Sequence, residues 1–232
     1  MKIFANISWL IATIIIFVSI AISIFTYYLL PKPYAVKMSS WILRLGLFFS
    51  TEKQGKEDPN VQMFLINHES DLDIAVMETI TNKDLAWVAK KELFNIPFFG
   101  LALKIAKDIP VERESKTSLV KLLRAAKDRI DNKRVITMFP EGTRSTKGKM
   151  LPFKSGAKLV ADKYKLCVQP VVLIQTQKYY NIKNFYYKPG RIKVIYMDSF
   201  IADKNDTEWL KDLRVKMQKV YDDELANNPR HR

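Results

Sequence analysis

Reactive chemistry in this sequence centres on one histidine, His68, and a carboxylate five residues later, Asp73. Both lie in the segment INHESDLD, which begins at Ile66. The chain has two histidines, and the other, His231, is the penultimate residue. An imidazole that donates one ring N–H to a carboxylate keeps a fixed tautomer, and its second nitrogen stays free to accept a proton. The pair therefore predicts general-base catalysis by His68, with Asp73 orienting the ring.

Simpler interpretations of this segment stay open. Ser70 and Asp73 have the spacing of a helix capping box, so Asp73 could serve only as a cap. His68 could be an ordinary turn residue. We expect neither a bound metal nor a cofactor, because the sequence has one cysteine, Cys167, and no histidine or cysteine cluster to complete a zinc site.

A second segment, FPEGTRS, could bind an anion. It follows an apolar run and extends from Phe139 to Ser145, and its proline and glycine favour a tight turn. Such a turn directs backbone N–H groups, the Thr143 hydroxyl and the Arg144 guanidinium toward one place, and a guanidinium suits a phosphate or carboxylate. Glu141 could hold that arginine or bind a substrate hydroxyl. The alternative is a plain solvated turn.

Short apolar runs bounded by turn residues surround both segments and predict the strands of one α/β domain. The expected strands are Val61–Ile66, Leu85–Ala89, Ile109–Val111, Arg134–Phe139, Val168–Ile174 and Ile192–Met197. Apolar residues at helical spacing predict helices over residues 70–80, after a cap at Ser115 as far as Ile130, and from Thr207 to Leu225. We therefore expect a mixed, mainly parallel sheet flanked by helices, with His68 in a turn between strand and helix.

The N-terminus predicts a membrane anchor. No charged residue occurs from Ile3 to Leu30, a length that can cross a hydrocarbon core of ~30 Å. A signal peptide is the alternative, but its apolar region would be shorter and a small-residue cleavage site would follow, where this chain has Tyr27–Pro31. A second apolar stretch, Ala35–Ser50, contains Lys37 and Arg44. It is expected to form an interfacial helix, or the second arm of a hairpin in one leaflet.

The charge balance points to an anionic partner. Lysine and arginine number 38 against 24 acidic residues, a net charge of +14. Membrane phospholipids fit this charge, whereas nucleic acid is not expected because the basic residues are dispersed and no nucleic-acid-binding motif occurs. One basic residue precedes the anchor and three follow it: Lys2, then Lys32, Lys37 and Arg44. This bias predicts a cytoplasmic domain, 53–232, on the inner membrane, joined to a membrane-associated helical segment, 1–52.

His-x4-Asp followed about seventy residues later by FPEGTRS resembles the glycerolipid acyltransferase family, most closely the bacterial 1-acyl-sn-glycerol-3-phosphate acyltransferases. The likeness covers roughly residues 60–175. VAKKELFNIPFFG is similar to a stretch in which the family implies a phosphate-binding lysine at Lys90, with Lys91 as the alternative register. IPVER is similar to the second motif, with Arg113 at its basic position, and VQPVVLI around Pro170 is similar to the fourth.

The resemblance implies transfer of a fatty acyl group from a thioester to the sn-2 hydroxyl of lysophosphatidic acid, giving phosphatidic acid. His68 would be the base and Asp73 its partner. The implied acceptor-binding residues are Lys90, Arg113, Glu141, Gly142, Thr143 and Arg144. Backbone amides near Gly142 are a hypothesis for the oxyanion site. We expect direct transfer without an acyl-enzyme, because Cys167 lies within a predicted strand far along the chain from His68.

Several alternatives stay open on the sequence. The donor could be acyl-carrier protein or acyl-CoA, since both are anionic. The acceptor could be another lyso-lipid, such as a lyso-ornithine lipid, or glycerol 3-phosphate. From a different class, the chain could be a membrane-tethered module that binds anionic lipid headgroups without chemistry.

Overall fold

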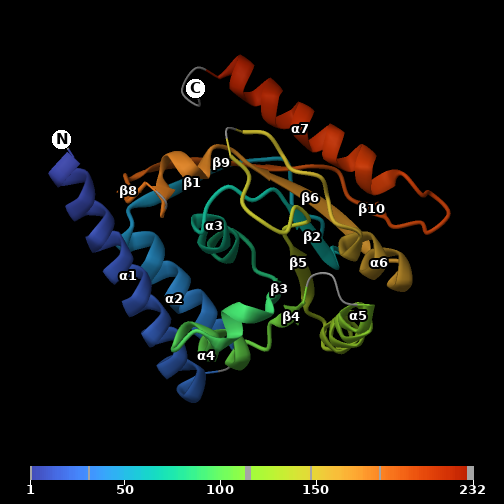
Figure 1. Cartoon of the computed structure of the whole chain (residues 1–232), viewed down its shortest axis with the longest axis horizontal. Helices are drawn as coiled ribbons and strands as arrows, with labels where there is room; N and C mark the ends of the chain where they lie inside the picture. Colours follow the sequence, from blue (N-terminus) through green and yellow to red (C-terminus); the bar gives the residue numbers. More distant parts are fainter. Residues whose placement is uncertain (1, 31, 113–115, 147, 183, 229–232) are drawn as a thin grey trace.

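A mixed β-sheet runs through the centre of the molecule (Figure 1). The structure is a computed structural model that describes residues 2–30, 32–112, 116–146, 148–182 and 184–228. Within them, eight strands form this sheet in the order β1-β9-β6-β2-β5-β3-β4, with β10 beside β6. The strands are β1 Phe49–Gln54, β2 Met63–Ile66, β3 Leu85–Lys90, β4 Ile109–Val111, β5 Val135–Met138, β6 Cys167–Leu173, β9 Gly190–Tyr196 and β10 Phe200–Ile201.

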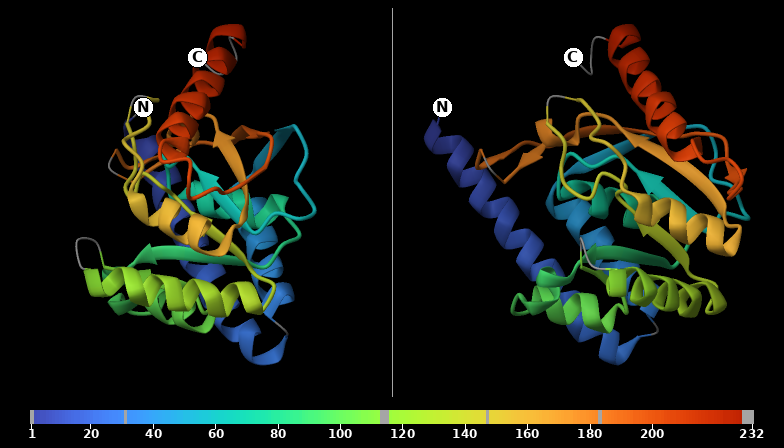
Figure 2. Two further views of the ribbon diagram at one scale, coloured as in Figure 1. Left: turned by 90° about the vertical axis from the view of Figure 1, so that its right-hand side faces the viewer. Right: turned by 45° about the vertical axis from the view of Figure 1, so that its right-hand side comes forward.

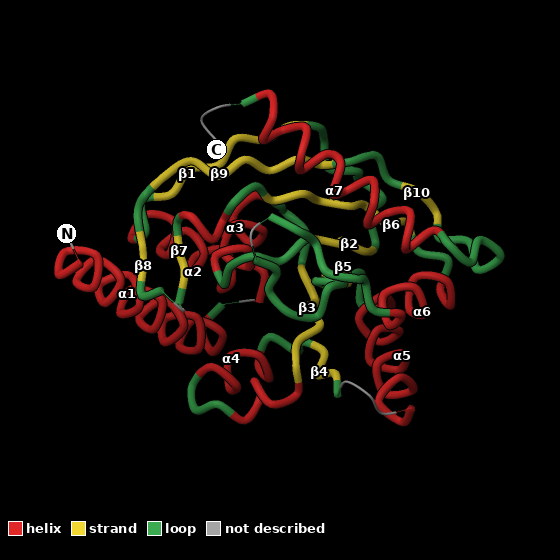
Figure 3. Tube along the Cα trace, turned by 45° about the horizontal axis from the view of Figure 1, so that its top comes forward, coloured by secondary structure: helices red, strands yellow, loops and turns green. Residues whose placement is uncertain are grey.

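Five neighbouring strands, β6, β2, β5, β3 and β4, run parallel, whereas β9 and β10 are antiparallel to β6. In register, Leu65 of β2 is level with Met138 of β5, and Lys90 of β3 is level with Val111 of β4. The carboxyl ends of these strands therefore lie along one edge, where α/β sheets bind their ligands. Figure 3 shows the loops gathered at the ends of β2 and β5. The mixed, mainly parallel sheet expected from the sequence is confirmed.

Helices cover both faces of the sheet (Figure 2). On one face, α3 (Leu72–Ile80) packs on Phe64 and Ile66 of β2. The opposite face carries Met63 and Leu65 and is covered by α5 (Lys116–Asp131), α6 (Ser155–Tyr164) and α7 (Trp209–Asn227). Strand β2 is completely buried, because alternate side chains enter opposite cores. This two-sided burial explains why β2 is a continuous apolar run in the sequence.

The N-terminal residues form a helical hairpin along one side of the domain. Its arms are α1 (Lys2–Leu29) and α2 (Lys32–Gly46), and a side chain at Gly46 would lie 2.7 Å from Ile15 of α1. Near its N-terminus α1 contacts the small β-hairpin of β7 (Tyr180–Asn181) and β8 (Tyr186–Tyr187), and it also contacts α4 (Phe99–Ile105) (Figure 1). By length and composition, Ile7–Leu29 is long and apolar enough to cross a membrane, and 11% of its most apolar window is buried.

Some elements were not anticipated from the sequence. Strand β1 begins within the stretch expected to be an interfacial helix and crosses the expected boundary between residues 52 and 53. Its sequence, FSTEKQ, has one apolar residue, and it is held at the sheet edge by backbone pairing with β9. The short β7–β8 hairpin, α4, α6, β10 and the 3-10 helices η1 (Lys91–Asn95) and η2 (Thr176–Lys178) were also missed. The cap expected at Ser115 lies outside the described residues.

Candidate active site

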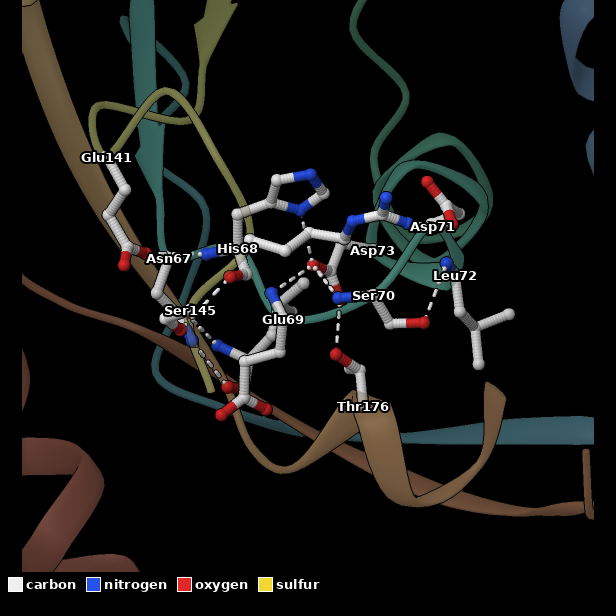
Figure 4. A network of polar contacts seen from close by, with 12 residues as sticks. Asn67, His68, Glu69, Ser70, Asp71, Leu72, Asp73, Glu141, Ser145 and Thr176 are labelled. Carbon is white, nitrogen blue, oxygen red and sulfur yellow. Dashed lines mark hydrogen bonds and ion pairs between the residues drawn. The ribbon is translucent and has the colours of Figure 1, made fainter. Parts of the chain in front are cut away.

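The predicted contact between His68 and Asp73 is present in the turn between β2 and α3. The distance from His68 Nδ1 to Asp73 Oδ2 is 2.8 Å (Figure 4). Asp73 is completely buried, and 14% of the His68 side chain is exposed. With Nδ1–H donating to the carboxylate, the lone pair of the imidazole lies on Nε2. This is the tautomer that a general base requires.

Asp73 accepts three further hydrogen bonds. Its Oδ2 atom accepts from the backbone N–H of Glu69 at 2.8 Å and of Ser70 at 3.0 Å, and its Oδ1 atom accepts from the Thr176 hydroxyl. Thr176 is fully buried just beyond the end of β6. Asp73 therefore binds backbone amides at the start of α3, as a cap would, and also holds the imidazole. The carboxylate makes the contacts that each of the two interpretations requires.

The FPEGTRS turn holds the backbone of His68 from the neighbouring strand. The His68 N–H donates to Oε1 of Glu141 at 2.8 Å. The His68 carbonyl accepts from the backbone N–H of Ser145 at 2.7 Å and from its hydroxyl at 3.1 Å. Figure 4 shows Glu141 and Ser145 beside the His68 backbone. The two segments are thus parts of one site. The FPEGTRS turn holds the backbone of His68 and so fixes the position from which the imidazole projects.

Both carboxylate oxygens of Glu141 accept a backbone hydrogen bond. While Oε1 binds His68, Oε2 accepts the Leu151 N–H at 2.7 Å. Burial raises the pKa of Glu141, although the two backbone hydrogen bonds act in the opposite direction. Arg144, which the sequence suggested as a partner of Glu141, instead forms an ion pair with Asp71.

Gly142 allows the sharp turn after β5. Its φ of +70° is a conformation that side-chain-bearing residues rarely adopt. Its N–H donates to the Phe139 carbonyl at 2.9 Å, so this amide is already used within the turn. Among the amides near Gly142 that could stabilise an oxyanion, the N–H of Gly142 itself is therefore already engaged. The next residue, Thr143, is exposed.

A row of aromatic rings supports the imidazole. The His68 ring stacks on Phe139 with a centroid distance of 3.8 Å and an interplanar angle of 11°. Phe139 in turn stacks on Trp87 of β3 at 5.2 Å. The Trp87 Nε1–H donates to Glu78 Oε1 at 2.7 Å. This row fixes the plane of the imidazole in addition to the hydrogen bonds at its backbone and Nδ1.

The predicted lysine lies at the same sheet edge but apart from the histidine turn. Lys90 ends β3, two strands from β2, a lateral separation of roughly 10 Å. Its Nζ atom is 3.4 Å from Glu92, whereas that of Lys91 is 2.6 Å from Glu112. Arg113, predicted to be a further phosphate ligand, lies outside the described residues.

Sequence reasoning missed a second layer of residues behind the turn. The Tyr221 hydroxyl of α7 donates to Oε1 of buried Glu69 at 2.7 Å. Burial, reinforced by the negative charges of Asp73 and Glu141, raises the pKa of Glu69 to about 8. The C-terminal helix therefore contacts the active-site turn through a carboxyl group that is largely protonated at pH 7.

Strand β6 and its following loop hold the turn from the other side. The Asn67 side chain exchanges two hydrogen bonds with the backbone of Leu173, at 2.9 and 2.7 Å. The Ser70 hydroxyl donates to the Tyr180 carbonyl at 2.6 Å. The only sequence signal for these roles was the presence of polar residues beside His68 directly after an apolar strand.

Comparison with known proteins identifies the family of this chain. The family model described as Acyltransferase matches residues 50–174, which include β2, the histidine turn, β5 and the FPEGTRS turn. The chain therefore belongs to the acyltransferase family.

Particular relatives share much of the chain. A 1-acyl-sn-glycerol-3-phosphate acyltransferase from Helicobacter pylori (strain J99 / ATCC 700824) is 40% identical over 171 residues, covering 73% of this chain and 72% of the relative. An enzyme of the same name from Cocos nucifera is 27% identical over 214 residues, covering 86% and 68%. The crystal structure of the 1-acyl-sn-glycerophosphate acyltransferase PlsC from Thermotoga maritima superposes with a TM-score of 0.77 at 20% identity, covering 98% and 97% of the two chains. That likeness shows the fold.

Proposed function

We propose that this chain transfers a fatty acyl group from an acyl thioester to the sn-2 hydroxyl of 1-acyl-sn-glycerol 3-phosphate, giving phosphatidic acid. The names of its relatives support the acceptor. The observation that carries the proposal is the state of His68, whose Nδ1 is bound to buried Asp73 at 2.8 Å, so that Nε2 can accept a proton.

The reaction follows from this geometry. Nε2 of His68 removes the proton of the acceptor hydroxyl as its oxygen attacks the thioester carbonyl carbon. The tetrahedral intermediate collapses, the C–S bond breaks, and the leaving thiolate takes the proton from the imidazolium. Asp73 stabilises the imidazolium through Nδ1–H. General-base assistance of this kind typically accelerates a reaction by ~10²–10⁴-fold.

We assign the acceptor phosphate to the basic residues along the same sheet edge. Arg144 is the nearest to the histidine turn, because its guanidinium binds Asp71, three residues after His68. Lys90 ends β3, which lies two strands from β2 along the edge. Arg113, which lies outside the described residues, stays a candidate from the sequence alone. A phosphate held there keeps the glycerol hydroxyl near Nε2, which is a proximity contribution to the rate.

The hairpin of α1 and α2 would hold the enzyme at the lipid surface. Exposed apolar side chains cover both helices, and α1 is fixed to the domain through β8 and α4. These attachments favour a hairpin embedded beside the domain over a helix that spans the bilayer away from it. The positive charges that follow α1 favour the cytoplasmic side of the inner membrane.

A thiol-release assay tests the function directly. Purified enzyme in detergent–phospholipid micelles receives an acyl thioester and lysophosphatidic acid, and the free thiol is measured with each donor in turn, acyl-carrier protein and coenzyme A. Release that depends on lysophosphatidic acid is expected. Replacing the acceptor with glycerol 3-phosphate or lyso-ornithine lipid tests the alternatives, and release independent of acceptor would contradict the proposal.

His68→Ala should abolish turnover, with His231→Ala as the matched control because it removes the other histidine. Equal thermal unfolding of His68→Ala and wild type would show that the loss is chemical. Near-normal turnover by His68→Ala would remove this residue from the mechanism.

A further inference from the structure

Asp71 is bound to the guanidinium of Arg144, the group that the proposed function assigns to the acceptor phosphate. One nitrogen of the guanidinium, Nη1, binds Oδ2 of Asp71. The two side chains are 34% and 46% exposed. Arg144 belongs to the FPEGTRS turn and Asp71 to the N-terminus of α3, so the pair joins the two segments at the molecular surface.

This pair can open at little cost. Exposed ion pairs contribute only about 0–1 kcal/mol to stability, because water competes for both groups. Asp73, two residues further on, shows the contrast: it is fully buried and bonded to His68 and Thr176. Asp71 caps no backbone amide with its side chain. The Asp71 carboxylate can therefore leave Arg144 while the histidine turn stays intact.

The surroundings of the pair suit the headgroup of a lysophospholipid. Asp71 and Arg144 line one open pocket together with Ser70, Thr146, Gln177 and Asn181. The hydroxyl of Thr146 and the amides of Gln177 and Asn181 are groups that can donate hydrogen bonds to phosphate oxygens and accept them from a glycerol hydroxyl. The pocket also adjoins the His68 turn through Glu69 and Ser70.

Part of the pocket wall lies outside the residues that match the family model. Gln177 and Asn181 come from η2 and β7, which follow residue 174, where the match to the family model ends. The Ser70 hydroxyl holds this segment to the histidine turn by donating to the Tyr180 carbonyl at 2.6 Å. The headgroup pocket is therefore attached directly to the turn that carries the base.

We propose that Asp71 is a resident counter-ion, which the phosphate of the acceptor displaces from Arg144. This inference rests on the proposed function. A phosphomonoester carries about −1.5 to −2 charges at pH 7 and offers several oxygens to a bidentate guanidinium. It competes with a carboxylate for Arg144, whereas an acceptor without a phosphate leaves the pair closed. Because of this competition, an acceptor must carry a group that binds Arg144 more tightly than the Asp71 carboxylate does.

The test is the substitution Asp71→Asn, assayed by thiol release over a range of lysophosphatidic acid concentrations. Asparagine retains the size of the side chain and is equally suited to a helix N-terminus. Because the competing charge is gone, KM for lysophosphatidic acid should fall about two- to fivefold, the range that an exposed ion pair allows, while kcat stays near that of wild type.

The matched control is Asp128→Asn, which removes one negative charge from the exposed side chain of Asp128, the ion-pair partner of Arg129. It should leave KM unchanged and so exclude a general effect of net charge on the anionic acceptor. In an Arg144→Gln background, Asp71→Asn should change KM by less than it does alone, because the competition acts through the arginine.

The outcomes separate this inference from the proposed function. If wild type does not turn over lysophosphatidic acid, the proposed function fails. If wild type is active but Asp71→Asn raises KM or leaves it unchanged, the counter-ion inference alone is overturned. An increase would mean that Asp71 orients Arg144 for phosphate rather than competing with it.

Discussion

The turn after β2 and the end of β3 lie at the same edge of the sheet, but they are built differently. In the turn, Asp73 is fully buried and accepts four hydrogen bonds, and both backbone groups of His68 are bound by the FPEGTRS turn. At the end of β3, the Lys90 and Lys91 side chains are 45% and 54% exposed and contact exposed carboxylates.

This difference matches the two tasks of the proposed reaction. Proton transfer needs a base held in one tautomer and one position before the acceptor arrives. Binding a phosphate needs long cationic side chains that can exchange a weak partner for a stronger one, and exposed lysines do so at little cost. We therefore expect substitutions of the buried His68–Asp73 pair to change kcat and substitutions at the end of β3 to change KM.

After His68→Ala, the largest expected effect is that of Asp73→Asn. The amide keeps the shape of the side chain but places an N–H₂ group where the carboxylate now accepts, so the imidazole loses its orienting partner. We expect kcat to fall by about 10²–10⁴-fold with a small change in KM, measured by thiol release. A variant that keeps kcat within about threefold of wild type would show that the buried contacts serve folding and not catalysis.

Glu69→Gln sharpens the comparison through pH. Glu69 keeps its proton in the folded state up to a pKa of about 8, whereas in the unfolded chain it loses the proton near ~4.3. Between these values the folded state binds more protons, so the free energy of unfolding falls as pH rises. Relative to Glu69→Gln, wild type should lose about 2–4 kcal/mol from pH 5 to pH 8.

Thermal unfolding of both proteins in the same detergent across this pH range measures the difference. Parallel curves for the two proteins would show that Glu69 is ionised in the folded state.

At the exposed end of β3, Lys90→Ala and Lys91→Ala form a matched pair. Lys91 is bonded to Glu112 at 2.6 Å, whereas Lys90 has a looser contact with Glu92 at 3.4 Å. Because Lys90 exchanges its partner more easily, Lys90→Ala should raise KM for lysophosphatidic acid about threefold to tenfold at unchanged kcat. Lys91→Ala should have little effect. The opposite result would assign the phosphate to Lys91, and a loss of kcat in both would contradict the division between the two regions.

The smallest expected effect concerns the residue behind the turn. Tyr221→Phe removes the hydroxyl that binds Glu69 and should lower the free energy of unfolding by about 1 kcal/mol. Tyr196→Phe is the control, since the Tyr196 hydroxyl is buried and has no hydrogen-bond partner among the described residues. Denaturant unfolding measures both. Equal destabilisation would mean that the Tyr221 hydrogen bond adds nothing to the free energy of unfolding.

The central strands could be predicted from the sequence because they are buried on both faces. Strand β2, for example, is the fully buried run MFLI, and it falls within the expected strand Val61–Ile66. Strand β1 could not be predicted, because backbone pairing with β9 holds its polar side chains at the sheet edge. The β7–β8 hairpin has strands of two residues each, too short for any period to show.

The candidate site could be predicted where it is local in the chain. His68 and Asp73 are five residues apart, and a turn before a helix suffices to bring them together. Thr176 and Tyr221, by contrast, reach the site only through the order of the strands and the packing of α7. The contacts of Glu141 were missed because Arg144, three residues later, suggested an ion pair, whereas two backbone N–H groups hold its carboxylate.

The hydrogen bonds between the histidine turn and distant parts of the chain have a consequence for how the protein folds during its synthesis. Its backbone is held by Glu141 and Ser145, and its partner Asp73 by Thr176. A nascent chain that has not yet emerged past these residues lacks an assembled base, even though its N-terminal hairpin already emerged. The contacts that hold His68 and Asp73 in place can therefore form only after Thr176 has been synthesised.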